Sequence, residues 1–243
     1  MATGIGKMKL FVKLFLFIAS IFLLSSCISS QPFPPEIPVA APIGVQTMRA
    51  PKVGQEWVYV VRNVFNQSVV DVITERVISV GNQVRIERTG EKNGRLPDEI
   101  QAPWGYVEQD AHWNPPQKFL SPVPLWPLKL ESGWSGSFPS RYEVVGYPGY
   151  AYYWNLIMSA QGWQKIKVPV GEFVVLKVVN EMPYFESNDI SRVANIRGEE
   201  FWLAPEIGRW VLRRSSGRYL WGGMNWSGAL WEDYLQWELV SWK

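Results

Sequence analysis

Few side chains in the sequence could take part in covalent or acid–base chemistry. Cys27 is the only cysteine and His112 the only histidine among 243 residues. A single histidine excludes a metal site built on two histidines, and a single cysteine excludes an internal disulfide. His112 lies in the stretch DAHWNPP, which is typical of a surface loop. A Ser-His-Asp triad would also need a serine on a strained turn, and GWSGS (133–137) lacks the final glycine of that motif.

Paired carboxylates are the remaining route to catalysis, because most glycoside hydrolases need only two of them. The candidates are Glu199–Glu200, Glu206 and Glu232–Asp233. Adjacent acids on a strand point to opposite faces, so neither doublet is expected to form a working pair by itself. A pair assembled from separate strands stays open. Phosphate-cradling and dinucleotide-binding motifs are absent from the sequence. We therefore expect no enzyme, no catalytic residues, no cofactor and no metal site.

The chain begins with the layout of a secretory signal peptide over residues 1–26. Three lysines precede an eleven-residue apolar run, Leu14 to Leu24, and two serines follow it. The run is too short for a membrane-spanning helix, which needs about 20 apolar residues. We therefore expect the leader to direct export and then to be removed.

Leu24-Ser25-Ser26-Cys27 resembles the lipobox of bacterial lipoproteins. The resemblance implies a thioether-linked diacylglycerol on Cys27, cleavage before it, and acylation of the new amino terminus with chains such as palmitate. Two or three acyl chains give stable membrane anchoring, whereas a single chain binds only marginally. Ile28, rather than aspartate, follows the cysteine, which favours the outer membrane under the usual sorting rule.

The expected mature chain is close to neutral. Of 24 basic residues, three are leader lysines, which leaves 21 against 22 acidic ones. No basic face for a nucleic acid is indicated. Residues 27–53 contain six prolines among Ser, Ala and Gln, which predicts a lipidated, extended tether. Residues 54–243 are expected to form one domain.

The domain sequence is predicted to be mainly β. Trp57, Tyr59 and Val61 alternate with Val58 and Val60, and similar alternation continues to residue 89 with turns at Gly81-Asn82 and residues 90–94. Two further turns are expected at residues 169–172 and 204–208, each with a glycine where a positive φ is needed. Prolines recur over residues 96–150, which predicts long loops or short edge strands there. The C-terminal stretch 229–243 is expected to be mostly strand.

Several motifs of the domain resemble a group of bacterial periplasmic and lipoprotein domains. They are, in order, Gly54-x-x-Trp57-x-Tyr59, Pro127-Leu128-Lys129-Leu130-x-x-Gly133-Trp134, Val168-Pro169-Val170-Gly171-x-Phe173-x-x-x-Lys177-Val178 and Phe201-Trp202-x-Ala204-Pro205-Glu206-Ile207-Gly208-x-x-Val211. That group is similar in fold to the lipoprotein-localisation factors (LolA/LolB-like folds). The resemblance implies a single curved antiparallel sheet, from a half-barrel to an open barrel. It implies no active-site residues.

Three functions follow as hypotheses. The first is a non-enzymatic outer-membrane lipoprotein, whose concave apolar surface binds a lipid-like ligand, or which binds an envelope partner protein. The second is a carbohydrate- or peptidoglycan-binding module with exposed tryptophans, although their five-residue spacing prevents all three from sharing one strand face: Trp221, Trp226 and Trp231. The third is a hydrolase that uses separated carboxylates.

Replacing the thiol tests the anchor. We expect Cys27→Ala to leave an uncleaved precursor without acyl chains, because sulfur is the nucleophile toward the lipid donor. Palmitate labelling and the mass of the amino-terminal peptide measure both effects. Recovery of the variant as processed protein in the outer-membrane fraction would contradict the assignment.

Overall fold

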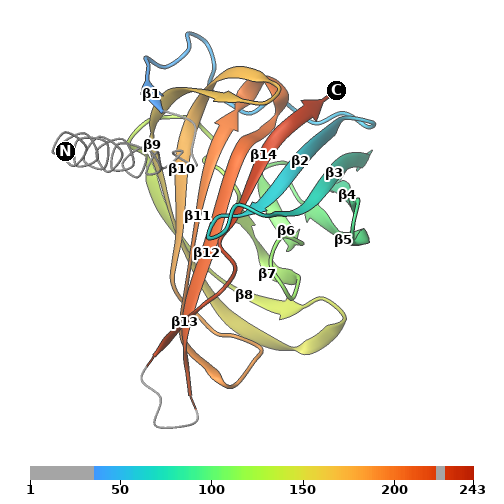
Figure 1. The fold of residues 1–243 in the computed structure, drawn as a ribbon, viewed down its shortest axis with the longest axis vertical. Helices are drawn as coiled ribbons and strands as arrows, with labels where there is room; N and C mark the ends of the chain where they lie inside the picture. The colour runs from blue at the N-terminus through green and yellow to red at the C-terminus, as the bar shows by residue number, and fades with distance from the viewer. Residues whose placement is uncertain (1–35, 223–227) are drawn as a thin grey trace, which may run out of the picture. The chain divides into compact units, whose positions relative to one another are not determined.

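The computed structural model describes residues 36–222 and 228–243 (Figure 1). The predicted signal peptide, residues 1–26, and Cys27 lie outside these residues. The described part belongs to one compact unit, Pro34–Lys243, and its regular secondary structure is almost wholly strand. Within this part, no helix has the length and apolar character needed to cross a membrane.

The described residues form fourteen strands and one short 3₁₀ helix. Their bounds are β1 (Ile37–Pro38), β2 (Glu56–Asn63), β3 (Val69–Val80), β4 (Val84–Gly90), β5 (Gly94–Gln101), β6 (Tyr106–Asp110), β7 (Gln117–Pro124), β8 (Ser135–Val144), β9 (Tyr147–Val168), β10 (Gly171–Phe185), β11 (Arg192–Ala204), η1 (Pro205–Ile207), β12 (Arg209–Trp221), β13 (Ala229–Trp231) and β14 (Leu235–Trp242).

The strands make one antiparallel sheet that closes on itself. The order is β9-β10-β11-β12-β14-β2-β3-β4-β5-β6-β7-β8, and β8 pairs again with β9, from Ser135 opposite Ser159 to Val144 opposite Tyr147. These twelve strands form a barrel, with β1 added beside β9 and β13 beside β12. The predicted mainly-β, antiparallel fold is confirmed, and closure removes the free edges of an open sheet.

The alternation in β2 explains how the barrel acquires its core. Trp57, Tyr59 and Val61 are almost completely buried, whereas Val58 and Val60 are only half-buried. Because successive side chains on a strand point to opposite faces, the first three residues enter the interior together. The meander expected up to residue 89 is confirmed as β2, β3 and β4, paired in sequence.

The proline-rich segment 96–150 is more regular than the sequence predicts. It supplies most of β5 and all of β6, β7 and β8, which complete the barrel wall. Pro97 lies where the β4–β5 register shifts, between the pairs Ile86–Glu99 and Arg88–Leu96. Pro139 lies on β8, which pairs with β7 only at residues 142–144 and so leaves one edge open there. Both are settings in which proline's missing N–H is tolerated.

Residues 36–53, which we call the N-terminal strap, are packed against the barrel. β1 pairs with β9, Met48 is buried, and the Arg49 amide donates to the Pro205 carbonyl oxygen at 3.0 Å. The Gln46 carbonyl oxygen accepts from the Leu130 amide at 2.9 Å. Residues 36–53, part of the extended tether predicted over residues 27–53, therefore lie on the barrel, because extended, proline-rich chain also suits pairing with a sheet. Residues 27–35 lie outside the described part.

The two predicted glycine turns are confirmed. Pro169 and Val170 join β9 to β10, and Gly171 follows with a φ of 147°. η1 joins β11 to β12 and ends at Gly208, which has a φ of 69° in the left-handed region. A Cβ atom at Gly208 would lie 2.8 Å from the Arg49 carbonyl oxygen, so this turn and the strap need a residue without a side chain.

Gly208→Ala tests the contact between turn and strap. We expect the free energy of unfolding to fall by about 2 kcal/mol, because alanine disfavours the left-handed conformation and its Cβ collides with the strap backbone. Chemical denaturation measures the change. Gly81→Ala is the matched control, because a Cβ there meets nothing within 4 Å. Equal stability of the two variants would contradict the account.

Candidate functional site

The barrel interior is filled by side chains in the described part of the chain. Large aromatic residues occupy much of it, and all are at most 3% exposed: Trp57, Tyr59, Phe201, Trp210 and Trp237. Their side chains take up space inside the barrel that an acyl chain would need. The expected lipid-binding place, the concave face of the sheet, is thus taken up by the protein's own core.

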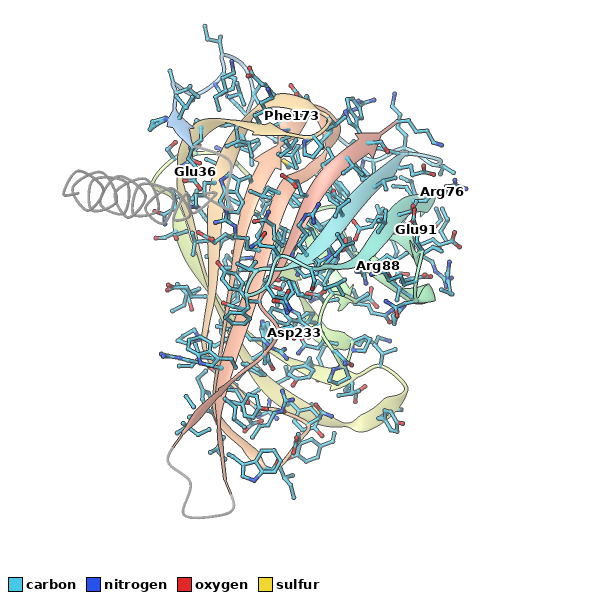
Figure 2. All side chains as sticks on the ribbon, in the orientation of Figure 1. Glu36, Arg76, Arg88, Glu91, Phe173 and Asp233 are labelled. Atoms are coloured by element: carbon cyan, nitrogen blue, oxygen red, sulfur yellow. The ribbon has the colours of Figure 1, made fainter. Side chains whose placement is uncertain are left out.

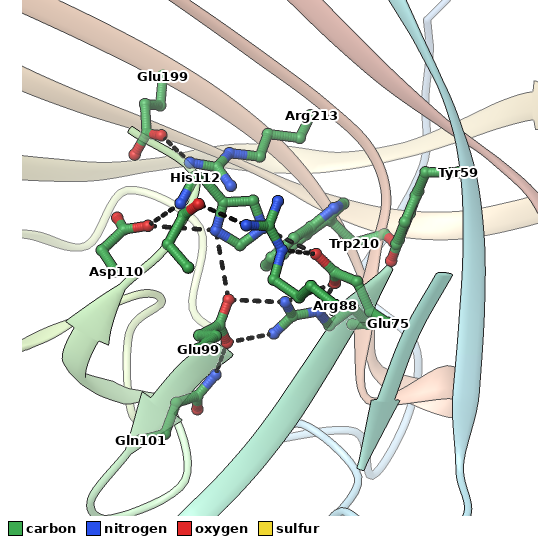
Figure 3. Close-up of polar contacts among 12 residues, drawn as sticks. Tyr59, Glu75, Arg88, Glu99, Gln101, Asp110, His112, Glu199, Trp210 and Arg213 are labelled. Atoms are coloured by element: carbon green, nitrogen blue, oxygen red, sulfur yellow. Dashed lines mark hydrogen bonds and ion pairs between the residues drawn. The ribbon is translucent and has the colours of Figure 1, made fainter. Parts of the chain in front are cut away.

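A buried ionic cluster lies among these aromatic residues (Figure 3). Arg209 Nη2 donates to Glu75 Oε2 at 2.7 Å and to Glu99 Oε2 at 2.8 Å, and Arg209 Nη1 donates to Glu99 Oε1 at 2.8 Å. The three side chains are at most 1% exposed and come from β12, β3 and β5. One guanidinium therefore joins two strands that lie more than 100 residues away from it in the sequence.

His112 extends the cluster toward one end of the barrel. Its Nε2 lies 2.8 Å from Glu75 Oε1, and its Nδ1 lies 3.2 Å from Asp110 Oδ1. Both ring nitrogens therefore face carboxylate oxygens. The side chain is 2% exposed, so the prediction of a surface-loop histidine is wrong. A polar sequence around His112 hides a side chain that points inward.

Charge neighbours decide the ionisation of the buried acids. Burial alone would raise the pKa of Glu75, but Arg209, His112 and Arg88 outweigh it and hold that pKa well below its usual value. At Glu99, burial alone would also raise the pKa, but the Arg209 charge outweighs it and the pKa of Glu99 is lowered. Burial raises the pKa of Glu199, even though Arg213 pairs with it.

These interior groups are bound to one another. Glu75 and Glu99 both bind Arg209, and Arg88 Nε donates to Glu75 at 3.1 Å while its Nη1 donates to the Ala111 carbonyl oxygen. A general acid or base needs a proton it can exchange with a substrate, and these carboxylates accept from arginines instead. Among the residues the structure describes, no group of His, Cys, Asp and Glu is placed to hold a metal ion.

The sequence carried a signal for this cluster that was missed. Along β3, the buried side chains are Asp71, Ile73, Glu75 and Val77, at every second position. Glu75 and Arg88 therefore share the inward phase with apolar neighbours on their own strands. A charged residue in an apolar phase predicts a buried ion pair, although its partner on a distant strand cannot be read from the pattern.

Below the cluster, one end of the barrel opens into a cavity of about 290 Å³, which we call the mouth pocket. Its lining combines aromatic, charged and polar side chains: His112, Trp113, Asn114, Arg192, Arg197, Ser215, Tyr219, Trp231, Glu232, Asp233 and Leu235. This end carries β13, whereas β1 lies at the other end (Figure 1). Figure 2 shows the same separation between Glu36 and Asp233.

An arginine pair holds the wall of the mouth pocket. Arg197 binds Glu232 through two contacts, Nε to Oε2 at 2.8 Å and Nη2 to Oε1 at 3.0 Å, and Arg192 Nη1 adds a third at 2.9 Å. The Arg197 guanidinium carbon lies 4.1 Å from the centroid of the Trp113 ring and 4.5 Å from that of Phe185. The ion pair and the two rings together fix the plane of this guanidinium.

The two predicted carboxylate doublets differ in outcome. Glu199 is buried against Arg213, while Glu200 lies on the other face beside Lys177, as expected for adjacent strand residues. Glu232 and Asp233 both line the mouth pocket, so the prediction of opposite faces is wrong for them. The reason is that they follow β13 and are not part of a strand. Glu232 is held by two arginines, which leaves Asp233 without a free acidic partner of that doublet.

The remaining sequence candidates lie apart from one another. Trp231 lines the mouth pocket and is 63% exposed. Trp221 is exposed at the end of β12, and Trp226 lies outside the described residues. Glu206 is exposed in η1, at the end of the barrel near the strap. Of the predicted tryptophans, the structure therefore places Trp231 in a pocket.

No family model and no curated protein matches the chain. Among solved structures, it is similar to a proposed lipoprotein from Parabacteroides distasonis, with a TM-score of 0.51 and 11% identity over 82% of this chain and 99% of that one. The two share a fold. A proposed exported protein with a YmcC-like fold from Bacteroides fragilis has a TM-score of 0.49 and 13% identity over the same shares. The link to the lipoprotein-localisation factors stays a prediction.

Arg209→Met tests the role of the ionic cluster. We expect the free energy of unfolding to fall by roughly 3–5 kcal/mol, because Glu75 and Glu99 keep their burial and lose their shared cation. Urea denaturation at neutral pH measures the loss. Arg76→Met is the control: Arg76 pairs with Glu56 while 51% exposed, and such surface pairs contribute about 1 kcal/mol or less. Similar losses in both variants would overturn the assignment.

Proposed function

We propose that the chain is a non-enzymatic lipoprotein of the bacterial cell envelope, anchored to the outer membrane by acyl chains on Cys27, and that its barrel mouth binds a saccharide. The lipobox-like stretch ending at Cys27 supports the anchor. The similar protein from Parabacteroides distasonis is itself described as a proposed lipoprotein, which agrees with this setting.

The choice of a saccharide as ligand rests on the side chains that line the mouth pocket. The barrel interior is occupied by its own side chains, and the mouth offers open space for a ligand. There, Tyr219 and Trp231 stand beside Arg192, Glu232 and Asp233. Aromatic rings offer flat apolar faces, and the charged side chains offer hydrogen-bond donors and acceptors. That combination suits sugar rings with hydroxyl groups better than acyl chains.

The charge balance of the pocket favours an uncharged ligand. Arg192 and Arg197 contribute two positive charges, and Glu232 and Asp233 contribute two negative ones. Most of this charge is paired within the wall, since Glu232 binds both arginines. A strongly anionic or cationic ligand would meet no excess of opposite charge there.

The strap limits how far the proposed lipid anchor can lie from β1. Eight residues separate Cys27 from Glu36, where the described chain begins beside β9, and so short a stretch spans at most about 30 Å. The mouth lies at the opposite end of the barrel from β1. We therefore expect the mouth to face away from the membrane that holds the lipid anchor, toward the cell wall.

Other functions have weaker support. A lipid-like ligand would need an apolar cavity, and the barrel interior is filled. A carboxylate-dependent hydrolase would need two acids free to exchange protons across one cleft, and Glu232 is engaged by Arg192 and Arg197. An envelope partner protein remains the alternative for the exposed aromatic side chains near the mouth.

A sedimentation assay with purified cell-wall sacculi tests the proposed function. The full-length lipidated protein, held in detergent micelles, is expected to sediment with sacculi, and Trp231→Ala is expected to reduce retention about tenfold because an exposed ring at the mouth is lost. Trp242→Ala is the control, since Trp242 is also exposed but lies at the end of β14 far from the mouth pocket. Absence of retention, with acyl-chain ligands found by native mass spectrometry instead, would refute saccharide binding.

A further inference from the structure

We infer that a second pocket at the mouth receives the hydroxyl groups of a terminal neutral sugar, and that an adjoining tyrosine-lined groove carries the next sugar units. This inference rests on the proposed function and adds the place, the polarity and the direction of the ligand. The second pocket, which we call the side pocket, has a volume of about 230 Å³. Its lining includes Gln117, Tyr142, Asp189, Arg192 and Arg197.

Arg197 supplies an unused donor in the wall of the side pocket. Two of its nitrogens bind Glu232, but Nη1 is buried and has no hydrogen-bond partner among the described residues. The side chain as a whole is 5% exposed and is held between two aromatic rings. A buried N–H group left without a partner has lost its hydrogen bonds to water, and a ligand oxygen would restore one.

Gln117 supplies an unused acceptor in the same wall. This β7 residue is 2% exposed, and its Oε1 is buried without a partner among the described residues. Gln117 and Arg197 both act on the Tyr142 side chain: burial raises the pKa of Tyr142 to about 12, and the Arg197 charge and the Gln117 amide oppose that rise. All three side chains line the side pocket, so the unused donor and the unused acceptor belong to residues of one pocket lining.

A hydroxyl group matches this pair of unused atoms. A hydroxyl accepts one hydrogen bond and donates another, so it can accept from Arg197 Nη1 and donate to Gln117 Oε1. A carboxylate would satisfy the arginine but would face the Gln117 oxygen without a proton to donate. The charges around the pocket also balance, because Arg192 and Arg197 are paired with Asp189 and Glu232. Both unused atoms are closed off from solvent, so an entering hydroxyl must part the side chains of the pocket wall.

The groove beside the side pocket has a different character. It has a volume of about 500 Å³ and shares Phe185, Ser187 and Arg192 with the side pocket. Tyr150 and Tyr184 line it and are 64% and 48% exposed. Tyrosine rings pair an apolar face with a polar hydroxyl, which suits contact with a sugar ring. The groove is larger than the side pocket, so it provides room for further units of a chain whose end enters the side pocket.

Binding of defined oligosaccharides to the full-length lipidated protein in detergent micelles tests the inference. The probes are neutral β-1,4-linked N-acetylglucosamine oligomers of two to six units and an oligogalacturonate series of the same lengths, measured by isothermal titration calorimetry. We expect the neutral series to bind, with affinity that rises with length, and the acidic series to bind at least tenfold more weakly.

Two variants separate the pocket from the groove. Gln117→Met keeps the volume and removes the acceptor, and we expect it to weaken every neutral oligomer about tenfold. Tyr184→Ala is expected to weaken the longer oligomers more than the dimer, because the ring contacts later units. Gln161→Met, at an exposed position on β9 outside the pockets described here, is the control, and unchanged thermal unfolding of all variants shows that the fold is kept.

The outcomes distinguish the two levels of the proposal. If Trp231→Ala abolishes retention on sacculi while Gln117→Met binds the oligomers as the unaltered protein does, the proposed function stands and the side-pocket inference is wrong. Tighter binding of the acidic series would also overturn the inference, because it requires an anion site. If neither sacculi nor any oligomer is bound, the proposed function itself fails.

Discussion

The barrel depends on one cation, the Arg209 guanidinium, placed between two buried carboxylates. Burial alone would raise the pKa of Glu75 and of Glu99, and Arg209 is the nearby charge that lowers both most strongly. Their shared arginine converts two costly buried charges into a link between β3, β5 and β12. Closure of the sheet brings these strands within reach, and the aromatic core around the cluster excludes water. The interior is thus a packed core whose volume is taken up by the protein's own side chains.

Because the interior is filled, the recognition that we propose is assigned to the mouth. β11 and β12 continue past the core toward the end that carries β13, and their side chains there meet the segment that contains His112 to Asn114. The arginines of the core and of the mouth differ in their partners. Arg209, in the core, is surrounded by carboxylates, whereas Arg197, at the mouth, has one nitrogen without a partner among the described residues. At the other end of the barrel, the strap packs on the turn after η1, where the Arg49 carbonyl oxygen lies against Gly208.

Patterns of neighbouring residues in the sequence predict the strands and turns, because these elements depend on short-range interactions. Alternation at Trp57 to Val61 and the glycines at positions 171 and 208 gave the strands and turns correctly, since both depend on neighbouring residues only. The side of the strand on which Glu75 is buried was also visible, but its partner Arg209 is 134 residues away, and no spacing encodes that pairing. The burial of the His112 side chain and the packing of the strap were not predicted for a related reason. Polar or proline-rich composition indicates an exposed segment, and the sequence does not show that a distant part of the chain covers it. The mouth arises from such distant contacts, so among its residues the sequence pointed only to Trp231, as a sugar-stacking ring, to the Glu232–Asp233 doublet, as candidate acids, and to His112, which it placed on a surface loop.

The pH dependence of stability tests the central ionic cluster most directly. The pKa values of Glu75, Glu99 and Asp110 are lowered on folding, so their stabilising effect is present above the ordinary values of 4.5 and 3.8 and is lost as the pH falls through the lower folded values. Glu199, whose pKa is raised, acts in the opposite sense and only partly offsets them. Urea unfolding between pH 7 and pH 3 should show a free energy of unfolding that declines below about pH 4.5, and Glu99→Gln should flatten that decline. A stability that is constant or rises on acidification, with the same slope in Glu99→Gln, would contradict the account.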